Sequence, residues 1–316
     1  HKMQYNCIAI VRKVDDGMAP PVNELAQVIH EYGVIRKVGI FDHHLGTDLP
    51  ADPGNVLFVS LGGDGTLLYA ANKSMEYPQE SGIVGFNLGR LGFLTEDIDK
   101  TTNNASFNRV PNDVVKESAT KDAIFSYLDA IMANDREKVK PDTRMMLEAT
   151  VHKDGVLNWD GAEKFYAINE VTLYTSLRNF MDTKVAINSM MVGTYGGNGV
   201  TVTTSTGSTA LGLSAGGSII NPSANVMQIA PLLPHKIARQ PIITSGRDEV
   251  ILRSNTTSRT KKMYVLADSR QIAELNFEKG EEFVDVMIRR AKQDITIWRP
   301  SNWNFFDVMS RKMGWM

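Results

Sequence analysis

A glycine-rich turn that carries one acidic residue is the strongest chemical signal in the sequence. Leu61-Gly-Gly-Asp-Gly-Thr66 directly follows an apolar segment and precedes a segment of helical character. Glycine lets a ligand come close to the backbone, and the N–H groups at the start of a helix favour a phosphate. Asp64 could accept the proton of an attacking hydroxyl or help to hold Mg²⁺. We predict that Asp64 is catalytic and that phosphate groups bind at Gly62, Gly63, Gly65 and Thr66.

Two better-known phosphate-binding patterns do not match this turn. The chain has no Gly-x-x-x-x-Gly-Lys-Ser/Thr loop, and the spacing of Gly62, Gly63 and Gly65 differs from the Gly-x-Gly-x-x-Gly dinucleotide pattern. The alternative without chemistry is a tight turn in which the Asp caps the following helix.

Two polar segments in the second half of the chain could contact a ligand. Ile168-Asn-Glu-Val171 places two polar residues inside an apolar strand, and an edge strand or a bulge is the alternative reading. The segment from Gly197 to Gly217 is dense in hydroxyl and small side chains. Small residues pack closely on a flat ligand, and Ser and Thr supply donors and acceptors, although turn chemistry alone explains the same composition.

The elements that must position these residues change character along the chain. Up to about residue 140, apolar segments such as Cys7–Val11 and Val56–Leu61 alternate with segments of helical periodicity. Alternation of this kind predicts a Rossmann-like, doubly wound α/β domain. Beyond Pro141, short segments rich in Val, Ile, Thr and Tyr predict a β-rich, β-sandwich-like domain; they include Ala167–Tyr174, Val185–Ile187, Val200–Thr204 and Tyr264–Leu266. Asn103–Asp113 is polar and is expected to be a loop.

Composition narrows the class of partner. The 316 residues hold 34 Lys and Arg against 36 Asp and Glu, a net charge of -2, so no global positive field draws the chain to nucleic acid or to a membrane. Cys7 is the single cysteine and lies in an apolar segment, which indicates a reducing compartment. No apolar run reaches the length of about 20 residues that a membrane-spanning helix needs. We expect a cytoplasmic enzyme.

Taken together, the motifs resemble the NAD kinase family, in its bacterial ATP-NAD kinase form. Four of them occur in the family's order, and further similar segments follow at Pro231–His235, Arg239–Pro241, Ala267–Ser269 and Asn304–Trp315. The four are Gly62–Gly65, Asn87–Thr95, Asn169-Glu170, and Thr206–Ala210 with Ser214–Gly217. The resemblance extends from about Val56 to the end of the sequence.

The resemblance implies a kinase that transfers a phosphoryl group from ATP to the adenosine ribose 2′-hydroxyl of NAD and gives NADP. It implies an α/β domain over residues 1–140 and an NAD-binding domain over 141–295, with a site between them and a tail, 296–316, that packs back on the first domain. Asp64 is then the general base, and Mg²⁺ accompanies ATP. A homo-oligomer, dimer or tetramer, is expected. The implied NAD contacts are Asp64, Gly65, Asn169, Glu170, Asn198, Thr209, Ala210, Leu211 and Ser214.

Three positions depart from the family pattern. Asn198 stands where the family usually has Asp, Leu211 where it commonly has Tyr, and Arg270 where it usually has Gln. Asn keeps an acceptor and adds a donor, whereas Leu offers neither a hydroxyl nor an aromatic face. These changes bear on substrate preference and rate more than on fold.

Two other functions remain open at this point. A lipid kinase of the diacylglycerol kinase type shares a Gly-Gly-Asp-Gly-Thr turn, but Thr206–Ala210 and Asn169-Glu170 favour the dinucleotide. A dinucleotide-binding sensor could have lost turnover through Asn198 and Leu211. Asp64 argues against a sensor, because a binder needs no carboxylate at the reacting hydroxyl.

Overall fold

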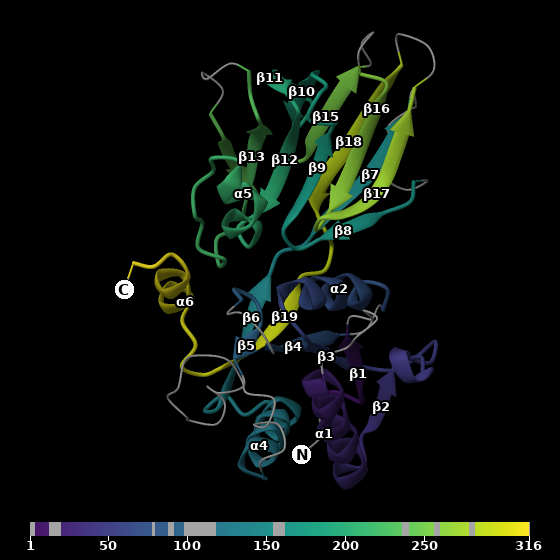
Figure 1. Ribbon diagram of the computed structural model, residues 1–316, viewed down its shortest axis with the longest axis vertical. Helices are drawn as coiled ribbons and strands as arrows, with labels where there is room; N and C mark the ends of the chain where they lie inside the picture. Colours follow the sequence, from purple (N-terminus) through teal and green to yellow (C-terminus); the bar gives the residue numbers. More distant parts are fainter. Residues whose placement is uncertain are drawn as a thin grey trace. The chain divides into compact units, whose positions relative to one another are not determined.

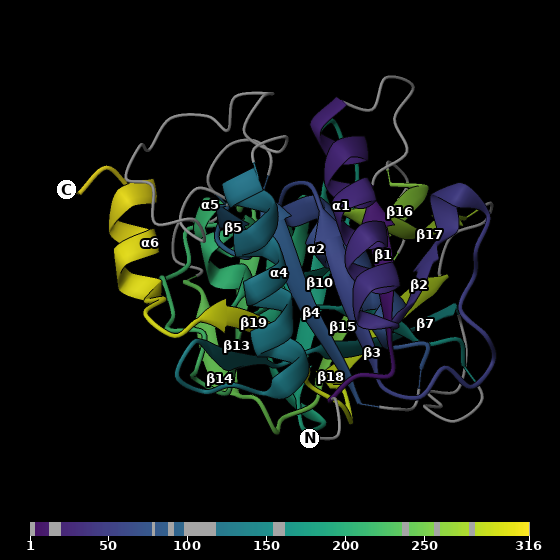
Figure 2. The same cartoon turned by 90° about the horizontal axis from the view of Figure 1, so that it is seen from below.

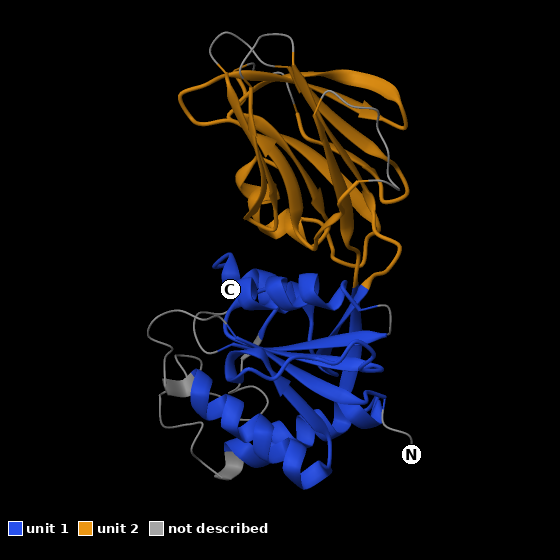
Figure 3. Ribbon diagram, turned by 90° about the vertical axis from the view of Figure 1, so that its right-hand side faces the viewer, with its two compact units in different colours: residues 1–143, 295–316 blue, residues 144–294 orange. Residues whose placement is uncertain are grey.

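The computed structural model divides the chain into two compact units, which are coloured separately in Figure 3. The first comprises residues 1–143 and 295–316, and the second comprises residues 144–294. The structure describes residues 4–12, 20–77, 80–87, 92–97, 118–153, 162–235, 240–255, 260–277 and 282–315. The loop expected at 103–113 and the resemblance at Arg239 lie outside the described residues, as do residues 88–91 of the second motif.

The first unit is built on a seven-stranded sheet with the strand order β2-β1-β3-β4-β19-β6 and with β5 beside β4. Strands β1, β2, β3, β4 and β19 form parallel pairs along this order. Figures 1 and 2 show α1 and α4 on one face of the sheet and α2 on the other. The strands are β1 (Cys7–Arg12), β2 (Gly39–Asp42), β3 (Val56–Leu61), β4 (Ser81–Asn87), β5 (Glu96–Asp97), β6 (Val139–Arg144) and β19 (Ile295–Pro300). The helices are α1 (Pro20–Arg36), the 3₁₀ turn η1 (His43–Leu45), α2 (Asp64–Ser74), α4 (Ser118–Ala133) and α6 (Phe305–Lys312).

Helices on both faces explain why the central strands are apolar throughout. Every residue of β3 is buried, as a parallel strand covered on both sides requires. One core joins β1, β3 and β4 to α1 and α4 and includes Trp298 from the last strand of the unit. The predicted doubly wound domain is confirmed.

The second unit contains two six-stranded sheets that share one hydrophobic core. Their strand orders are β11-β10-β15-β18-β7-β8 and β14-β13-β12-β9-β16-β17, and the pairing is antiparallel. The predicted β-sandwich-like domain is therefore confirmed. Its elements are β7 (Leu147–Lys153), β8 (Phe165–Ala167), β9 (Glu170–Tyr174), β10 (Met181–Ile187), β11 (Met190–Gly197), β12 (Gly199–Thr204), η3 (Gly207–Thr209), α5 (Leu211–Ser214), β13 (Val226–Leu232), β14 (Ile242–Ser245), β15 (Val250–Asn255), β16 (Lys262–Ala267), β17 (Arg270–Asn276) and β18 (Phe283–Arg290).

One predicted strand is divided in the structure. The segment 167–174 was expected to be continuous, but β8 ends at Ala167 in one sheet and β9 begins at Glu170 in the other. Ile168 and Asn169 carry the chain from sheet to sheet. The two polar residues in the apolar run therefore mark a crossing between sheets.

Among the described helices, none combines the length and the apolar character that crossing a membrane requires.

Candidate active site

The glycine-rich turn joins β3 to α2 and places Asp64 in the first turn of that helix. Gly62 has a φ of 151°, and a Cβ there would lie 2.5 Å from Thr66 Oγ1, so this position requires glycine. At Gly63 and Gly65 an added Cβ would meet nothing within 4 Å, and both residues are exposed. The backbone at the start of α2 is thus open to a ligand, in the place where a helix favours an anion.

The Asp64 carboxylate is held by donors from a second segment of the same unit. Its Oδ2 accepts the N–H of Phe93 at 2.7 Å. Its Oδ1 accepts the N–H groups of Leu94 and Thr95, both at 3.1 Å, and the hydroxyl of Thr95 at 3.0 Å. We call the segment Phe93–Thr95 the Asp64 cradle. Asp64 itself is half-buried, so its carboxylate is fixed in direction and remains within reach of solvent.

The cradle approaches Asp64 closely because residue 92 has no side chain. A Cβ at Gly92 would lie 2.0 Å from Asp64 Oδ1 and 2.7 Å from Thr95 Oγ1. No heavy atoms come that close without bonding, so a larger residue would force the carboxylate and the cradle apart. Gly92 is thus as necessary to the arrangement as the donors.

In the second unit, the polar pair Asn169 and Glu170 is fixed by a buried aspartate. Asp268 Oδ2 accepts the N–H of Ile168 at 2.9 Å, and Oδ1 accepts those of Asn169 at 2.7 Å and Glu170 at 3.4 Å. Asp268 is 4% exposed and has a φ of 50°, in the left-handed region. It lies at the tight turn between β16 and β17, which therefore clamps the crossing between the sheets.

Glu170 is a buried acid beside a second acid. Its side chain is almost fully buried, and within the described part of the chain Oε2 has no hydrogen-bond partner. Burial, followed by the negative charge of Asp268, raises the pKa of Glu170 to about 7, although hydrogen bonds from Ser269 oppose this rise. A carboxyl group poised near neutrality can either donate or accept a hydrogen bond to a ligand.

The hydroxyl-rich segment packs directly against Asn169. Residue Thr203 of β12 pairs with Glu170, and the Thr204 hydroxyl donates to the Ile168 carbonyl and accepts the N–H of Gly207. A Cβ at Gly207 would lie 2.1 Å from the Asn169 carbonyl oxygen, so only glycine fits this contact. The motifs at 169–170 and 206–210, which lie far apart in the sequence, are brought together.

The residues expected to line the dinucleotide pocket follow in two short helical turns. Thr209, Ala210 and Leu211 are half-buried and Ser214 is exposed, so all four can be reached from solvent. The Thr209 hydroxyl donates to the Thr206 carbonyl at 3.2 Å.

Asn198 is anchored to the backbone through its amide nitrogen. It lies between β11 and β12, is 7% exposed, and its Nδ2 donates to the carbonyls of Ser176 at 2.9 Å and Asn179 at 2.8 Å. Both amide N–H donors are therefore committed to the backbone, which leaves Oδ1 as the atom that could address a ligand. A carboxylate could not make these two bonds.

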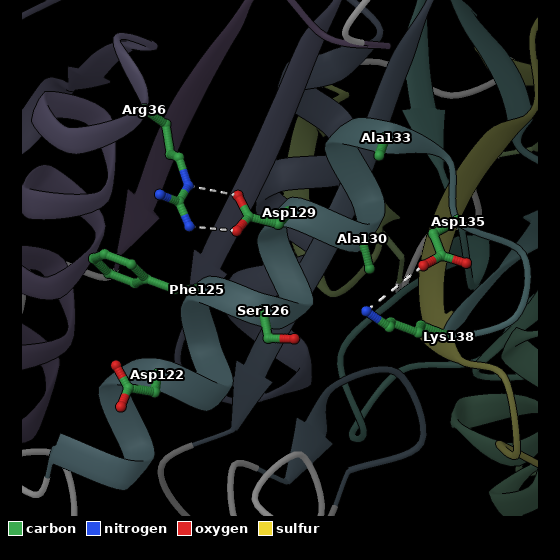
Figure 4. Close-up of a pocket in the computed structure, with 9 residues that line it drawn as sticks. All are labelled: Arg36, Asp122, Phe125, Ser126, Asp129, Ala130, Ala133, Asp135 and Lys138. Carbon is green, nitrogen blue, oxygen red and sulfur yellow. Dashed lines mark hydrogen bonds and ion pairs between the residues drawn. The ribbon is translucent and has the colours of Figure 1, made fainter. Parts of the chain in front are cut away.

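A surface cavity of about 390 Å³ in the first unit holds none of the predicted site residues. Figure 4 shows that it lies along α4 and is bordered by the ion pair between Arg36 and Asp129. Both partners are about 40% exposed, and such pairs contribute little to stability. We assign no chemistry to this cavity.

Metal ligands do not cluster in the part of the chain that the structure describes, where no three His, Cys, Asp or Glu side chains are grouped to hold an ion. The adjacent residues His43 and His44 lie in η1, and His43 pairs with Asp48.

The sequence alone did not single out three features of the site, which are Gly92, the backbone donors of the cradle, and Asp268. Gly92 and the cradle lie within the second family motif, but backbone N–H groups leave no mark in a sequence. Asp268 lies in one of the segments that resemble the family. The Asp-Ser turn between two apolar strands is the sequence pattern from which its role could have been predicted.

Comparison with known proteins identifies the family of the chain. The model of the ATP-NAD kinase C-terminal domain matches residues 168–293. An NAD kinase of Sulfurimonas denitrificans is 31% identical over 258 residues, which cover 81% of this chain and 76% of that relative.

Two solved structures share the fold. A yeast NADH kinase complexed with NADH has a TM-score of 0.76 at 17% identity, and the match covers 98% of this chain and 88% of the yeast chain. An Archaeoglobus fulgidus NAD kinase in complex with ATP has a TM-score of 0.63 at 18% identity, and the match covers 98% of this chain and 99% of the archaeal chain. Since the S. denitrificans relative exceeds 30% identity over most of both chains, this chain belongs to the NAD kinase family.

Proposed function

We propose that this chain transfers the γ-phosphoryl group of ATP to the adenosine ribose 2′-hydroxyl of NAD, with Asp64 as the general base. The observation that carries the proposal is the oriented carboxylate at the open start of α2. A carboxylate has about four lone-pair sites. Among the described residues, Oδ1 of Asp64 accepts three hydrogen bonds and Oδ2 accepts one, so Oδ2 is the oxygen with capacity to take up the hydroxyl proton.

The reaction balances with these groups. The 2′-oxygen forms a bond to the γ-phosphorus, the bond from that phosphorus to the β,γ-bridging oxygen breaks, and ADP leaves. The hydroxyl proton passes to Asp64 Oδ2. Phosphoryl transfer depends chiefly on positioning and on neutralising charge, and the backbone of Gly63 and Gly65 at the start of α2 is suited to contact the phosphates, together with Gly62 and Thr66.

The second unit supplies the NAD contacts in this proposal. Asn169 and Glu170 bind the adenosine, because an amide offers both a donor and an acceptor to a base edge, and Glu170 Oε2 is buried without a hydrogen-bond partner among the described residues. Thr209, Ala210, Leu211 and Ser214 line the pocket, and Asn198 contributes through Oδ1. Gly65 borders the nucleotide. In this proposal the second unit, residues 144–294, is the NAD-binding domain that was expected over 141–295.

Mg²⁺ fits the residues only as a companion of ATP. The described residues form no carboxylate cage, and Mg²⁺ is usually held by one or two carboxylates and substrate phosphates. Asp64 is the carboxylate that could share such an ion, and the ion would neutralise charge on the phosphates.

The setting of the enzyme is also a proposal. A buried free thiol at Cys7 is consistent with the cytoplasm. A homo-oligomer, dimer or tetramer, is supported by the edge strand β11, where Met190, Met191 and Val192 are 74%, 62% and 41% exposed. The net charge of -2 supports neither nucleic acid nor a membrane as partner.

The test is NADP formation from NAD, ATP and Mg²⁺ by the purified chain. Asp64→Asn should lower kcat by about 10² to 10⁴-fold, the usual contribution of a general base, while the Kd for NAD measured by calorimetry stays within a few-fold. Asp135→Asn, at a half-buried residue outside the site, is the control. Chelation of Mg²⁺ should abolish turnover of ATP.

Two outcomes would redirect the assignment. NAD binding without any NADP formation by the unaltered chain would favour the sensor. Phosphorylation of diacylglycerol but not of NAD would favour the lipid kinase.

A further inference from the structure

A charged residue lies inside an apolar strand of the first unit. Arg299 follows Ile295-Thr-Ile-Trp298 in β19, and its side chain is 0% exposed. In the sheet, β19 lies between β4 and β6. Arginine is almost never fully buried unless its charge is paired and its donors are used, so its partners indicate why it is there.

The partners of Arg299 include the backbone of the Asp64 cradle. Nη1 donates to the Leu94 carbonyl at 2.6 Å, and Nη2 donates to the Phe93 carbonyl at 3.4 Å. Nε donates to the Asp142 carboxylate at 3.0 Å, and the guanidinium lies over the Trp303 ring at 4.5 Å. The pairing with Asp142 offsets the cost of the buried charge, and the carbonyl oxygens of Leu94 and Phe93 accept bonds from Nη1 and Nη2.

These two carbonyls belong to the peptide groups that bind Asp64. The Phe93 carbonyl shares a peptide group with the Leu94 N–H, and the Leu94 carbonyl shares one with the Thr95 N–H. Both N–H groups donate to Asp64 Oδ1 at 3.1 Å. Each peptide group is therefore bonded to a cation at its oxygen and to a carboxylate at its nitrogen, an arrangement in which the hydrogen bonds polarise and strengthen one another.

We propose that Arg299 is a positioning residue for catalysis: it fixes the two peptide groups of the cradle and, through them, the direction of the Asp64 carboxylate. The inference rests on the proposed function of Asp64, and Arg299 itself touches no substrate. A merely structural role would support the fold equally with or without a carboxylate at residue 64. The coupling between Arg299 and Asp64 therefore separates the two roles.

The experiment compares Arg299→Met and Arg299→Lys in the full chain. Methionine keeps length and apolar packing without charge, and it should lower kcat about 10 to 100-fold while the KM for NAD changes less than about threefold. Lysine should restore part of the loss, because an ammonium group can bond one carbonyl but lacks the planar fork that spans two. Lys140→Met is the matched control: Lys140 donates to the Trp303 carbonyl at 2.6 Å, and its loss should leave kcat within about twofold.

The same substitution is then made in the Asp64→Asn chain. If Arg299 acts through Asp64, Arg299→Met should change the residual rate there less than about threefold. Equal fold losses with and without the Asp64 carboxylate would overturn the inference, as would an unchanged kcat in a folded Arg299→Met protein.

Hydrogen exchange gives a readout that does not depend on activity. The amides of Leu94 and Thr95 should exchange at least about tenfold faster in Arg299→Met and be unchanged in Lys140→Met. If the unaltered chain made no NADP, the proposed kinase function would be refuted. If the Leu94 and Thr95 amides exchanged at an unchanged rate in Arg299→Met, the positioning role of Arg299 would be refuted independently of that function. If Arg299→Met does not fold, the kcat and hydrogen-exchange measurements are made on Arg299→Lys and Asp142→Asn instead. Asp142→Asn removes the charge that pairs with Nε.

Discussion

The two units hold an acid in opposite ways. Asp64 is half-buried and receives four hydrogen bonds from the cradle, with a buried guanidinium on the far side of the peptide groups. Glu170 is buried, faces the negative charge of Asp268, and keeps one oxygen without a hydrogen-bond partner among the described residues. The first arrangement orients a carboxylate; the second brings the pKa of a carboxyl group to about 7.

This difference suits two tasks. A general base must point one oxygen at one hydroxyl, and a fixed frame of donors achieves this. A binding group can gain from being able to donate as well as accept, which a partly protonated carboxyl group provides. The predictions below remove each arrangement in turn.

The largest effect is expected from crowding the cradle with Gly92→Ala. The new Cβ would lie 2.0 Å from Asp64 Oδ1, so the carboxylate or the cradle must move by about an ångström. Misplacement on that scale costs about 10²-fold in rate, and steady-state kinetics should show this loss in kcat.

The control for this variant is Gly39→Ala, where the added Cβ meets its nearest atom at an ordinary 3.5 Å. It should leave kcat within about twofold. Full activity in Gly92→Ala would mean that the direction of the Asp64 carboxylate does not limit the reaction.

Next comes the pH dependence of stability that Glu170 creates. Because the folded-state pKa of about 7 exceeds the ordinary 4.5, the protonated form stabilises the fold. That contribution is complete below about pH 4.5 and is lost as the pH rises to 7 and above, a loss of up to about 3 kcal/mol. Glu170→Gln stays neutral, so its free energy of unfolding relative to the unaltered chain should rise between pH 5 and 8 in urea titrations.

Glu163→Gln serves for comparison, because Glu163 is an exposed acid of the same unit. A parallel pH profile for the unaltered chain and Glu170→Gln would contradict the raised pKa of Glu170.

The smallest effect is expected from Asn198→Asp, which adds a carboxylate where the backbone supplies acceptors. Its oxygens would face the carbonyls of Ser176 and Asn179, so unfolding should need about 1 to 3 kcal/mol less at neutral pH. Asn221→Asp is the matched change, because the Asn221 Oδ1 already accepts bonds from Ser223 and aspartate keeps them. Equal melting temperatures for the two variants would refute the donor role of Asn198.

The sequence predicted those structural features that are determined by residues close together in the chain. Val56–Leu61 was foreseen to the residue, because a buried parallel strand has a local pattern. The glycine-rich turn after it was also foreseen, but α2 begins at Asp64, inside the segment expected to be the turn. The crossing at Ile168 was missed, since the apolar pattern of one strand says nothing about which sheet it joins. Arg299 contacts a carbonyl 205 residues away along the chain, a relation that no local pattern encodes.

The position of β19 has a consequence for how the protein is made. The chain completes residues 1–143, passes through the whole second unit, and only then returns at Ile295 to insert between β4 and β6. During synthesis on a ribosome, the glycine-rich turn with Asp64 therefore emerges long before β19, the strand that carries Arg299. A nascent or prematurely terminated chain that ends before Ile295 would carry Asp64 but lack Arg299, and its sheet would be interrupted at the same place.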